Sequence, residues 1–131
     1  MREVAGQPAR AVDRGHITQL LMKLFELWKL TTEEQLACLG LSTDNRSVLT
    51  RYRQKTGSIS NSRDTMDRAG HLLAIHKNLR LLFPRNEELR YSWMKTRNRA
   101  FEGRTPVEAI QEFGLSGLLY VRSYLDRARG E

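Results

Sequence analysis

The stretch SRDTMDRAGHLLAIHKNLRLLFP, residues 62–84, is the longest part of this 131-residue sequence that keeps one helical period. Its apolar and half-apolar side chains recur three or four positions apart, which places them on or near one face of a helix. They are Met66, Ala69, Leu72, Leu73, His76, Leu79 and Phe83. Pro84 then ends the pattern, because proline cannot continue a helix. We therefore expect a long central helix against which the remaining elements pack.

Helical patterns continue on both sides of this segment. Before it, the residues Ile17, Leu20, Leu21, Leu24, Phe25 and Trp28 lie on one helical face that begins near Asp13. Two short helices are expected next, Thr31 to Gly40 and Ser42 to about Arg53. Three more helices are expected after the central segment: Asn86 to about Lys95, Thr105 to Phe113, and Leu115 to about Ala128. No segment alternates with period two over a useful length. The predicted fold class is all-α.

The turn NRAFEGRTPVEAI, residues 98–110, is the most sharply marked start of a helix. Thr105 is placed to cap the helix, Pro106 takes the first helical position, and Glu108 completes a capping box. The turn also lies in a basic patch that surrounds two aromatic residues, Trp93 and Phe101; the basic residues are Lys95, Arg97, Arg99 and Arg104. Aromatic and arginine side chains together are typical of protein interfaces, but the two aromatic rings can also plug the core, and both roles can coexist.

Composition narrows the classes of function. The 40% hydrophobic content of this 15.2 kDa chain is enough to bury a core without metals or disulfides, in one domain or in two small lobes that share the core. Cys38, the single cysteine, lies in an apolar helical stretch and is interpreted as a buried thiol. The sequence has no apolar run long enough to span a membrane and no signal-peptide pattern at its start, so we expect a cytoplasmic protein. The formal net charge of +7 permits a polyanionic partner.

Nothing in the sequence indicates an enzyme. His71 and His76 are five positions apart, which does not put both on one metal, and His16 stands alone. The sequence has no pair of cysteines, no HExxH motif and no glycine-rich phosphate loop. His76 is expected at the edge of the core. We therefore expect no catalysis, no metal and no cofactor.

The two short helices from Thr31 to Arg53 have the size and the glycine turn of a helix-turn-helix motif. The outer face of the second helix offers Asn45, Arg46, Thr50, Arg51 and Arg53, with Lys55 and Arg63 beyond it. Such side chains contact base edges and phosphates, although a face of this kind is also often only a solvated one. Any residue from Ser42 to Arg46 can begin the second helix, and a carboxylate at Asp44 repels phosphate unless it caps the helix.

The run from HLLAIHKNLRLLFP through WMKTRNRAFEGRTPVEAI to GLSGLLYVRSYLD closely resembles the Xre-type antitoxins of bacterial RES-Xre toxin-antitoxin modules, the MbcA/ParS/Xre group. The likeness extends from about Ile17 to Arg129. It implies an all-α antitoxin that forms a homodimer, represses its own operon through the helix-turn-helix, and neutralises a RES-domain toxin through its C-terminal domain. RES toxins consume NAD, whereas the antitoxin itself is not an enzyme. A dimer implies a palindromic operator DNA.

The resemblance divides the chain into a flexible arm (1–12), a helix-turn-helix region (13–62), and a central helix with a C-terminal toxin-binding domain (63–131). The basic C-terminal end, anchored by Leu118, Leu119, Val121, Tyr124 and Leu125, is expected to block the toxin's active site, as in relatives. The expected DNA-binding residues are Thr43, Asn45, Arg46, Thr50, Arg51, Arg53 and Lys55; the expected toxin-binding residues are Arg97, Arg99, Phe101, Arg104, Tyr124, Arg127 and Arg129. The alternative is a stand-alone dimeric transcriptional regulator without a toxin partner, which the absence of a neighbouring RES gene would indicate.

Overall fold

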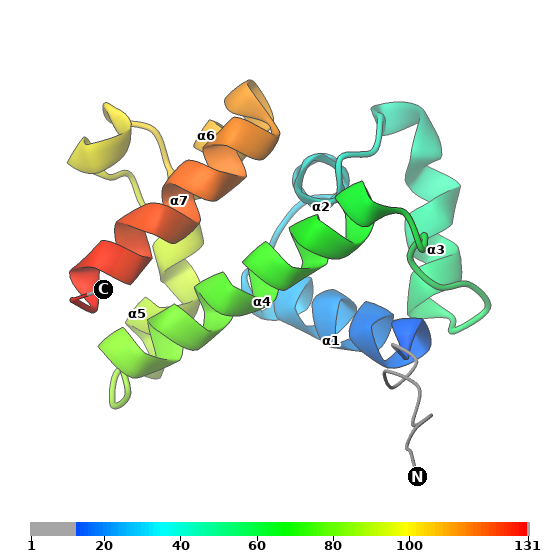
Figure 1. The fold of residues 1–131 in the computed structure, drawn as a ribbon, viewed down its shortest axis with the longest axis horizontal. Coiled ribbons are helices and arrows are strands. Elements are labelled where there is room, and N and C mark those ends of the chain that lie inside the picture. The colour runs from blue at the N-terminus through cyan, green and yellow to red at the C-terminus, as the bar shows by residue number, and fades with distance from the viewer. Residues whose placement is uncertain (1–12, 131) are drawn as a thin grey trace, which may run out of the picture.

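The structure is a computed structural model that describes residues 13–130, and within this range the protein is all-α, as predicted (Figure 1). The predicted arm, residues 1–12, lies outside the described residues. The α-helices between residues 13 and 130 are α1 (Arg14–Leu27), α2 (Thr32–Leu39), α3 (Arg46–Arg53), α4 (Arg63–Leu82), α5 (Glu87–Ser92), α6 (Pro106–Phe113) and α7 (Leu115–Ala128). Three short 3₁₀ turns join them: η1 (Thr43–Asn45), η2 (Trp93–Lys95) and η3 (Arg99–Phe101).

Two helices begin with a capping box, and the sequence analysis predicted the one at the start of α6. At the start of α2, the backbone N–H of Glu34 donates to the Thr31 hydroxyl at 3.2 Å, and the Glu34 carboxylate accepts from the Thr31 N–H at 2.8 Å. The same reciprocal pair joins Thr105 and Glu108 at the start of α6, at 3.0 and 2.9 Å. Each box satisfies N–H groups that the first helical turn leaves without a partner. The local sequence therefore sets both helix starts.

The connection between α2 and α3 answers which residue begins the second helix. Gly40 ends α2 in the left-handed conformation, with φ of 72°. The hydroxyl of Ser42 then accepts the backbone N–H of Asp44 at 3.3 Å, and this bond caps the 3₁₀ turn η1 and not an α-helix. The α-helix itself begins at Arg46. A similar tightening divides the helix predicted from residue 86 to residue 95 into α5 and η2.

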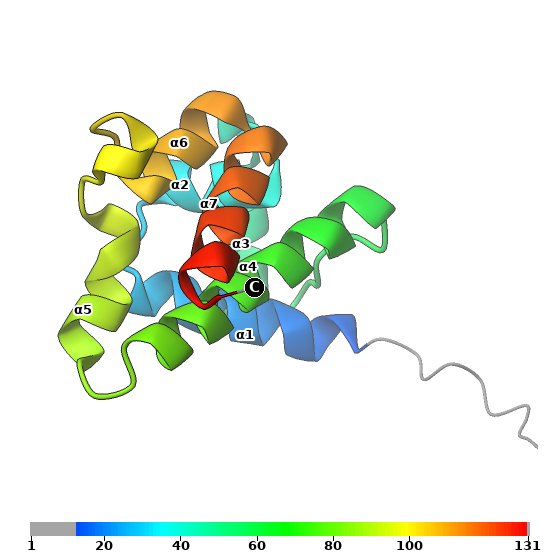
Figure 2. The ribbon, with the colours of Figure 1, turned by 60° about the vertical axis from the view of Figure 1, so that its left-hand side comes forward.

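Helix α4 is the central strut of the fold, as predicted. In Figure 1 it runs between α1 to α3 on one side and α5 to α7 on the other. Helix α7 lies beside it and runs in the same direction, because His71 of α4 meets Arg122 of α7, and further along Asn78 meets Asp126. Figure 2 shows α7 in front of α4 from the side.

One hydrophobic core extends through both halves of the described chain. Its largest fully buried side chains come from five of the helices, the residue that follows α1, the 3₁₀ turn η2 and the loop before α4: Leu21, Phe25, Trp28, Leu36, Leu39, Leu49, Ile59, Leu72, Ile75, Leu79, Met94 and Ile110. Helix α2 packs against α6, so the expected DNA-binding and toxin-binding regions share this core. The boundary drawn at residue 62 stays a prediction.

Candidate functional site

The turn at residues 98–104 is closed by its own backbone. The N–H of Asn98 donates to the carbonyl oxygen of Arg104 at 3.0 Å, and the N–H of Gly103 donates back to the carbonyl oxygen of Asn98 at 3.2 Å. The Asn98 side chain accepts the N–H of Ala100 at 2.9 Å, which caps η3. Glu102 and Gly103 both have positive φ, 56° and 85°, so the chain reverses sharply here. The result is a rigid projection before α6.

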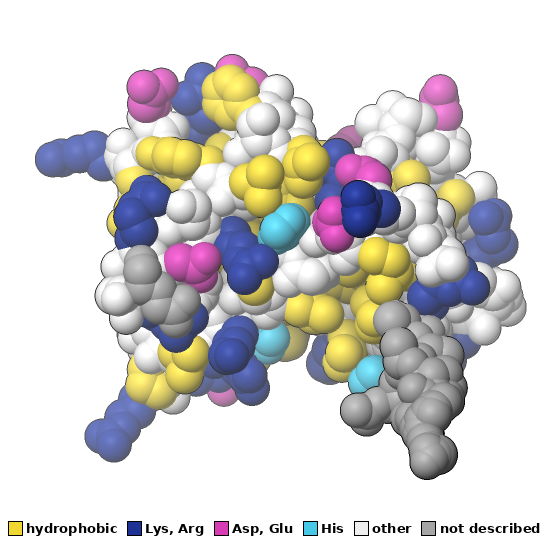
Figure 3. Space-filling model, viewed as in Figure 1, with side chains coloured by type: hydrophobic (Ala, Val, Ile, Leu, Met, Phe, Trp, Pro, Cys, Tyr) yellow, Lys and Arg dark blue, Asp and Glu magenta, His cyan; other side chains and the backbone are white. Residues whose placement is uncertain are grey.

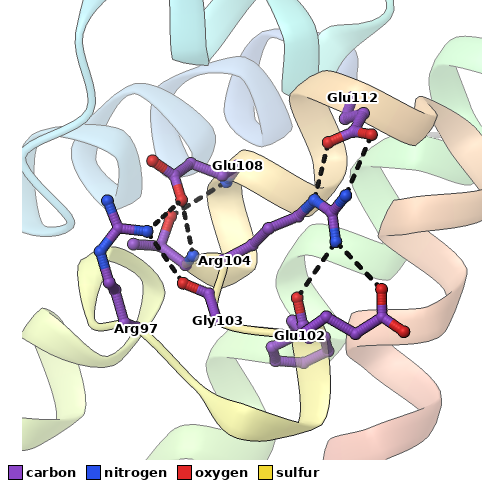
Figure 4. A network of polar contacts seen from close by, with 8 residues as sticks. Arg97, Glu102, Gly103, Arg104, Glu108 and Glu112 are labelled. Atoms are coloured by element: carbon purple, nitrogen blue, oxygen red, sulfur yellow. Dashed lines mark hydrogen bonds and ion pairs between the residues drawn. The ribbon is translucent and has the colours of Figure 1, made fainter.

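Arg104 ties this turn to the far end of α6 (Figure 4). Its guanidinium donates to both carboxylate oxygens of Glu112, from Nε at 2.7 Å and from Nη2 at 3.1 Å. Nη1 donates to the Phe101 carbonyl oxygen and to Glu102, each at 3.4 Å. Hydrogen bonding to Glu112 raises the pKa of Arg104 above its usual range. Such a two-pronged pair fixes geometry as well as charge.

Arg104 also covers an exposed ring, because its guanidinium carbon lies 5.1 Å from the centre of the Phe113 ring. This distance is within the range of a cation–π contact. Arg97, on the other side of the turn, donates from Nη1 to the Gly103 carbonyl oxygen at 2.8 Å and to Glu108 at 3.2 Å. Arg97 and Arg104 therefore brace the turn, whereas Arg99 lies on its exposed surface.

Phe101 is the buried centre of an aromatic cluster. Its side chain is only 4% exposed. Its ring lies edge-on to Trp93 at 6.1 Å, and to Tyr120 and Tyr124 at 5.4 Å each. Trp93 stacks on Tyr124 at 6.2 Å. Of the two roles considered for Phe101 and Trp93, the core role is the one observed, and a direct contact of Phe101 with toxin stays a prediction.

An apolar groove of about 280 Å³ opens beside this cluster, between η3, the end of α6 and the start of α7. Its lining includes two large exposed rings, Phe113 (51% exposed) and Tyr120 (47% exposed). The Tyr120 hydroxyl donates to the Ala100 carbonyl oxygen at 3.1 Å, which holds one wall in place. Hydrophobic side chains gather over α6 and α7 on the face shown in Figure 3. An apolar surface that remains exposed on a folded domain is a typical site of protein association.

This groove was not predicted from the sequence. Phe113 and Tyr120 were not among the predicted site residues, and Leu119, which was expected to anchor α7, is 42% exposed. Leu118, Val121 and Leu125 are buried as expected, and Tyr124 is partly buried. The signal available in the sequence was the position of Leu119 and Tyr120 away from the face formed by those buried residues.

The C-terminal end of α7 is ordered by side-chain contacts. Arg127 donates from Nη1 to the Ser123 hydroxyl at 2.7 Å, one turn earlier. Arg129 donates from Nε to the side-chain oxygen of Asn78 on α4. Tyr124 belongs to the aromatic cluster, so it lies between this end of the helix and the 98–104 turn. The predicted toxin-binding residues therefore form two regions, the braced turn and the helix end, joined by the aromatic cluster.

The predicted DNA-binding residues lie on and around α3. Thr43, Thr50, Arg51 and Lys55 are exposed there. Lysine and arginine side chains also lie over α3 on the face shown in Figure 3. Lys55 has a positive φ of 63° and follows the helix directly. These residues remain a predicted contact surface.

Three of the predicted DNA-binding residues make contacts within the protein. Arg46 forms an ion pair with Glu33 of α2, and Arg53 donates to the Gln35 side-chain oxygen at 3.1 Å. Asn45 donates to the Ser42 hydroxyl at 3.4 Å. The two arginines thus join α3 to α2. Their guanidinium groups can contact DNA only after they leave Glu33 and Gln35.

The side chains of Cys38 and His76 are packed in the protein interior or at its edge. Cys38 is fully buried, and burial raises the pKa of its thiol to about 12, which makes the thiolate nucleophile inaccessible. His76 stacks on Tyr91 at 6.1 Å, and burial lowers the pKa of its ring, in agreement with a position at the edge of the core. Within residues 13–130, no group of three His, Cys, Asp or Glu residues is placed to hold a metal. None of the described helices is long and apolar enough to cross a bilayer.

Comparison with known proteins agrees with the geometry of the C-terminal half. Residues 78–130 match the family model of the antitoxin Xre/MbcA/ParS C-terminal toxin-binding domain. This segment contains the braced turn, the aromatic cluster, the apolar groove and the end of α7. An uncharacterized protein, y4oB, of Sinorhizobium fredii (strain NBRC 101917 / NGR234) is 29% identical over 112 residues, which cover 86% of this chain and 83% of the relative. The C-terminal part of this chain, residues 78–130, is therefore similar to the toxin-binding domain of the Xre/MbcA/ParS antitoxins.

Proposed function

We propose that this protein is a cytoplasmic antitoxin that neutralises a RES-domain, NAD-consuming toxin and represses its own operon. The RES partner and the repressor activity follow from the resemblance of the sequence to RES-Xre antitoxins. The observation that carries the proposal is the exposed apolar groove of about 280 Å³ inside the domain that matches the toxin-binding family. In this proposal the protein acts by binding toxin and DNA.

The groove and the braced turn form the proposed toxin-binding surface. Phe113 and Tyr120 present large rings that are already held in place, by Arg104 and by the Ala100 carbonyl oxygen respectively. Rigid aromatic side chains lose little conformational entropy on binding and are frequent centres of binding energy. Arg104 and the exposed side chain of Glu102 are the charged residues that line the groove. The predicted blocking end, Arg127 and Arg129, belongs to the same domain.

Operator binding is proposed for the exposed side of α3. Thr50 and Arg51 lie on that side, and Thr43 and Lys55 flank its two ends. In a homodimer, two such faces would read the two halves of a palindromic operator. Arg46 and Arg53 would take part by exchanging Glu33 and Gln35 for phosphate or base acceptors.

The proposal is tested by substitution in the groove. Phe113→Ser removes an exposed ring, so we expect affinity for a RES-domain toxin to fall about thirtyfold, as for a hot-spot residue of about 2 kcal/mol. The measurement is calorimetric titration with a catalytically inactive form of that toxin. Leu20→Ser replaces another exposed apolar side chain, on α1, and is the control that should leave affinity unchanged. Equal affinities for both variants and the unmodified protein would place the toxin elsewhere.

The stand-alone regulator makes the opposite prediction. A regulator without a toxin partner would bind operator DNA and show no heat of binding with a RES-domain protein at any concentration. Growth of cells that express the toxin would then not be rescued by this protein. Rescue by the unmodified protein, together with loss of rescue by Phe113→Ser, supports the antitoxin.

A further inference from the structure

Asn78 is an unusual core residue of α4, since it is polar and only 1% exposed. Three other polar side chains are buried in the described chain, Thr18, Gln35 and Thr105, and each of them bonds to backbone atoms. The recorded partners of Asn78 are side chains of the last turn of α7 and its end, Asp126 and Arg129. A buried amide destabilises the fold unless it is hydrogen-bonded, so these two contacts are what its position requires.

The chemistry of the two partners fixes the orientation of the amide. The Asp126 carboxylate can only accept, so it faces the amide nitrogen, which donates to it at 2.8 Å. The Arg129 guanidinium can only donate, so it faces the amide oxygen. Asn78 thus joins an acceptor and a donor that are three residues apart on α7. Asparagine is the side chain of this length that serves both partners at once.

The contacts around this pair order the whole end of α7. Asp126 also forms an ion pair with Arg122 at 3.6 Å, and Arg122 donates to the ring of His71 on α4 at 2.9 Å. Here the ring nitrogen Nδ1 is the acceptor, which requires a neutral imidazole. Because His71 and Asn78 are two turns apart on α4, α7 is held to α4 by polar contacts at two points along its length.

We propose that Asn78 is a positioning residue for toxin binding: through Asp126 and Arg129 it holds the C-terminal end of α7 in the conformation that the toxin engages. This inference rests on the proposed function and on the prediction that this basic end blocks the toxin's active site. Asn78 is itself buried and touches no partner. Its effect is to order the Arg129 side chain before binding, so that less conformational entropy is lost when the complex forms.

The first test is Asn78→Leu, which keeps the size of the side chain and removes both hydrogen bonds. We expect amide hydrogen exchange over residues 123–130 to become faster and affinity for the inactive RES protein to fall about tenfold, with the helical circular dichroism retained. In an Arg129→Ala background, the same substitution should cause no further loss of affinity. An equal loss in both backgrounds would contradict the inference, because Asn78 would then act on the fold in general.

The second test exchanges the two polar groups. Asn78→Asp alone places two carboxylates together and should weaken toxin binding. Adding Asp126→Asn restores the set, because the new amide at position 126 donates to the carboxylate at position 78, which also accepts from Arg129. We expect this double variant to recover most of the affinity.

The outcomes separate the inference from the proposed function. If the unmodified protein binds toxin, and Asn78→Leu speeds exchange without changing affinity, only the positioning role is wrong. If the Asn78→Asp, Asp126→Asn double variant keeps its helical signal but does not recover affinity, the positioning role is likewise wrong. If the unmodified protein does not bind the RES protein at all, the proposed function is wrong and the positioning role is lost with it.

Discussion

Gly117 of α7 lies directly against the backbone of α6, because a Cβ built on it would come 2.2 Å from the carbonyl oxygen of Ala109. No real side chain tolerates that distance. The two helices that form the groove therefore approach each other only because position 117 is glycine. We expect Gly117→Ala to lower the free energy of unfolding by about 2 kcal/mol through overpacking, despite the better helix propensity of alanine. Urea denaturation followed by circular dichroism measures this change.

Gly70 provides the matched control for that substitution. It lies within α4, and a Cβ added there meets nothing within 4 Å. Gly70→Ala should therefore raise the free energy of unfolding by about 0.5 to 1 kcal/mol, because it restricts the unfolded chain and suits the helix. If Gly117→Ala and Gly70→Ala change the free energy of unfolding in the same direction, the close packing at Gly117 does not have the predicted effect.

Cys38 should report on unfolding. Its thiol is fully buried and its pKa is raised to about 12, so the folded protein should react with a thiol reagent at pH 8 only as fast as it opens. The unfolded thiol has a pKa of about 8.5. As pH rises from there toward 12, only the unfolded state loses the proton, and the free energy of unfolding falls.

The comparison that isolates this effect is with Cys38→Ala. The variant lacks the thiol, so its stability should decline less between pH 9 and pH 11 than that of the unmodified protein. Denaturant titrations at fixed ionic strength across that range measure the difference. Parallel curves for the two proteins, or fast labelling in the native state, would show that the thiol is not sequestered.

Features that depend on neighbours in sequence were predictable, and those that depend on neighbours in space were not. Thr105 with Glu108 sets a helix start within four residues, so the sequence alone marked it. The burial of Phe101 depends on rings that reach it from η2 and α7, and no local pattern contains that information.

The arginines of the predicted DNA-binding face show the same limit. Their exposure followed from the helical period, but the ion pair between Arg46 and Glu33 joins residues 13 apart in the sequence. Likewise, Arg104 resembles a binding arginine in the sequence and in the structure braces a turn against Glu112. The charge of an arginine is local information, whereas the carboxylate that it meets is set by the fold.

Glu33 should compete with DNA for Arg46. The backbone at the start of α2 and then Arg46 lower the pKa of Glu33, so its carboxylate is ionised and opposes phosphate at neutral pH. Glu33→Gln removes the competing charge, and we expect operator affinity to rise several-fold at low salt and less at high salt. Gel-shift titration at two salt concentrations measures this. Glu26→Gln, which affects an exposed ion pair with Lys23 on α1, is the control and should change affinity little.

Operator binding by the proposed dimer should depend steeply on salt. If each protomer contacts about three phosphates, the dimer contacts about six, and the slope of log affinity against log salt is expected to be roughly −5. Replacing Lys55, which is exposed just beyond α3, by alanine should reduce that slope by about 2 for the dimer, since one phosphate contact is lost per protomer. A slope near zero would show that the face of α3 does not meet the backbone of DNA.

The two activities should fail separately, because their proposed surfaces lie on different helices. Arg46 and Arg51 belong to α3, whereas Phe113 lies at the end of α6 beside the groove. Replacing Arg46 and Arg51 by alanine alters exposed side chains, so each change should affect stability by no more than about 0.5 kcal/mol. Each lost base contact should weaken operator binding by about 1 to 3 kcal/mol.

Growth rescue with co-expressed toxin, measured beside gel-shift titration, gives the decisive comparison. The Arg46→Ala, Arg51→Ala variant should keep rescue and lose operator binding, and Phe113→Ser should do the reverse. The shared core makes this a strict test, since α2 contacts both α3 and α6 and a general loss of packing would remove both activities together. If the arginine variant loses rescue but keeps its helical signal and its operator binding, the two surfaces have been assigned the wrong way round.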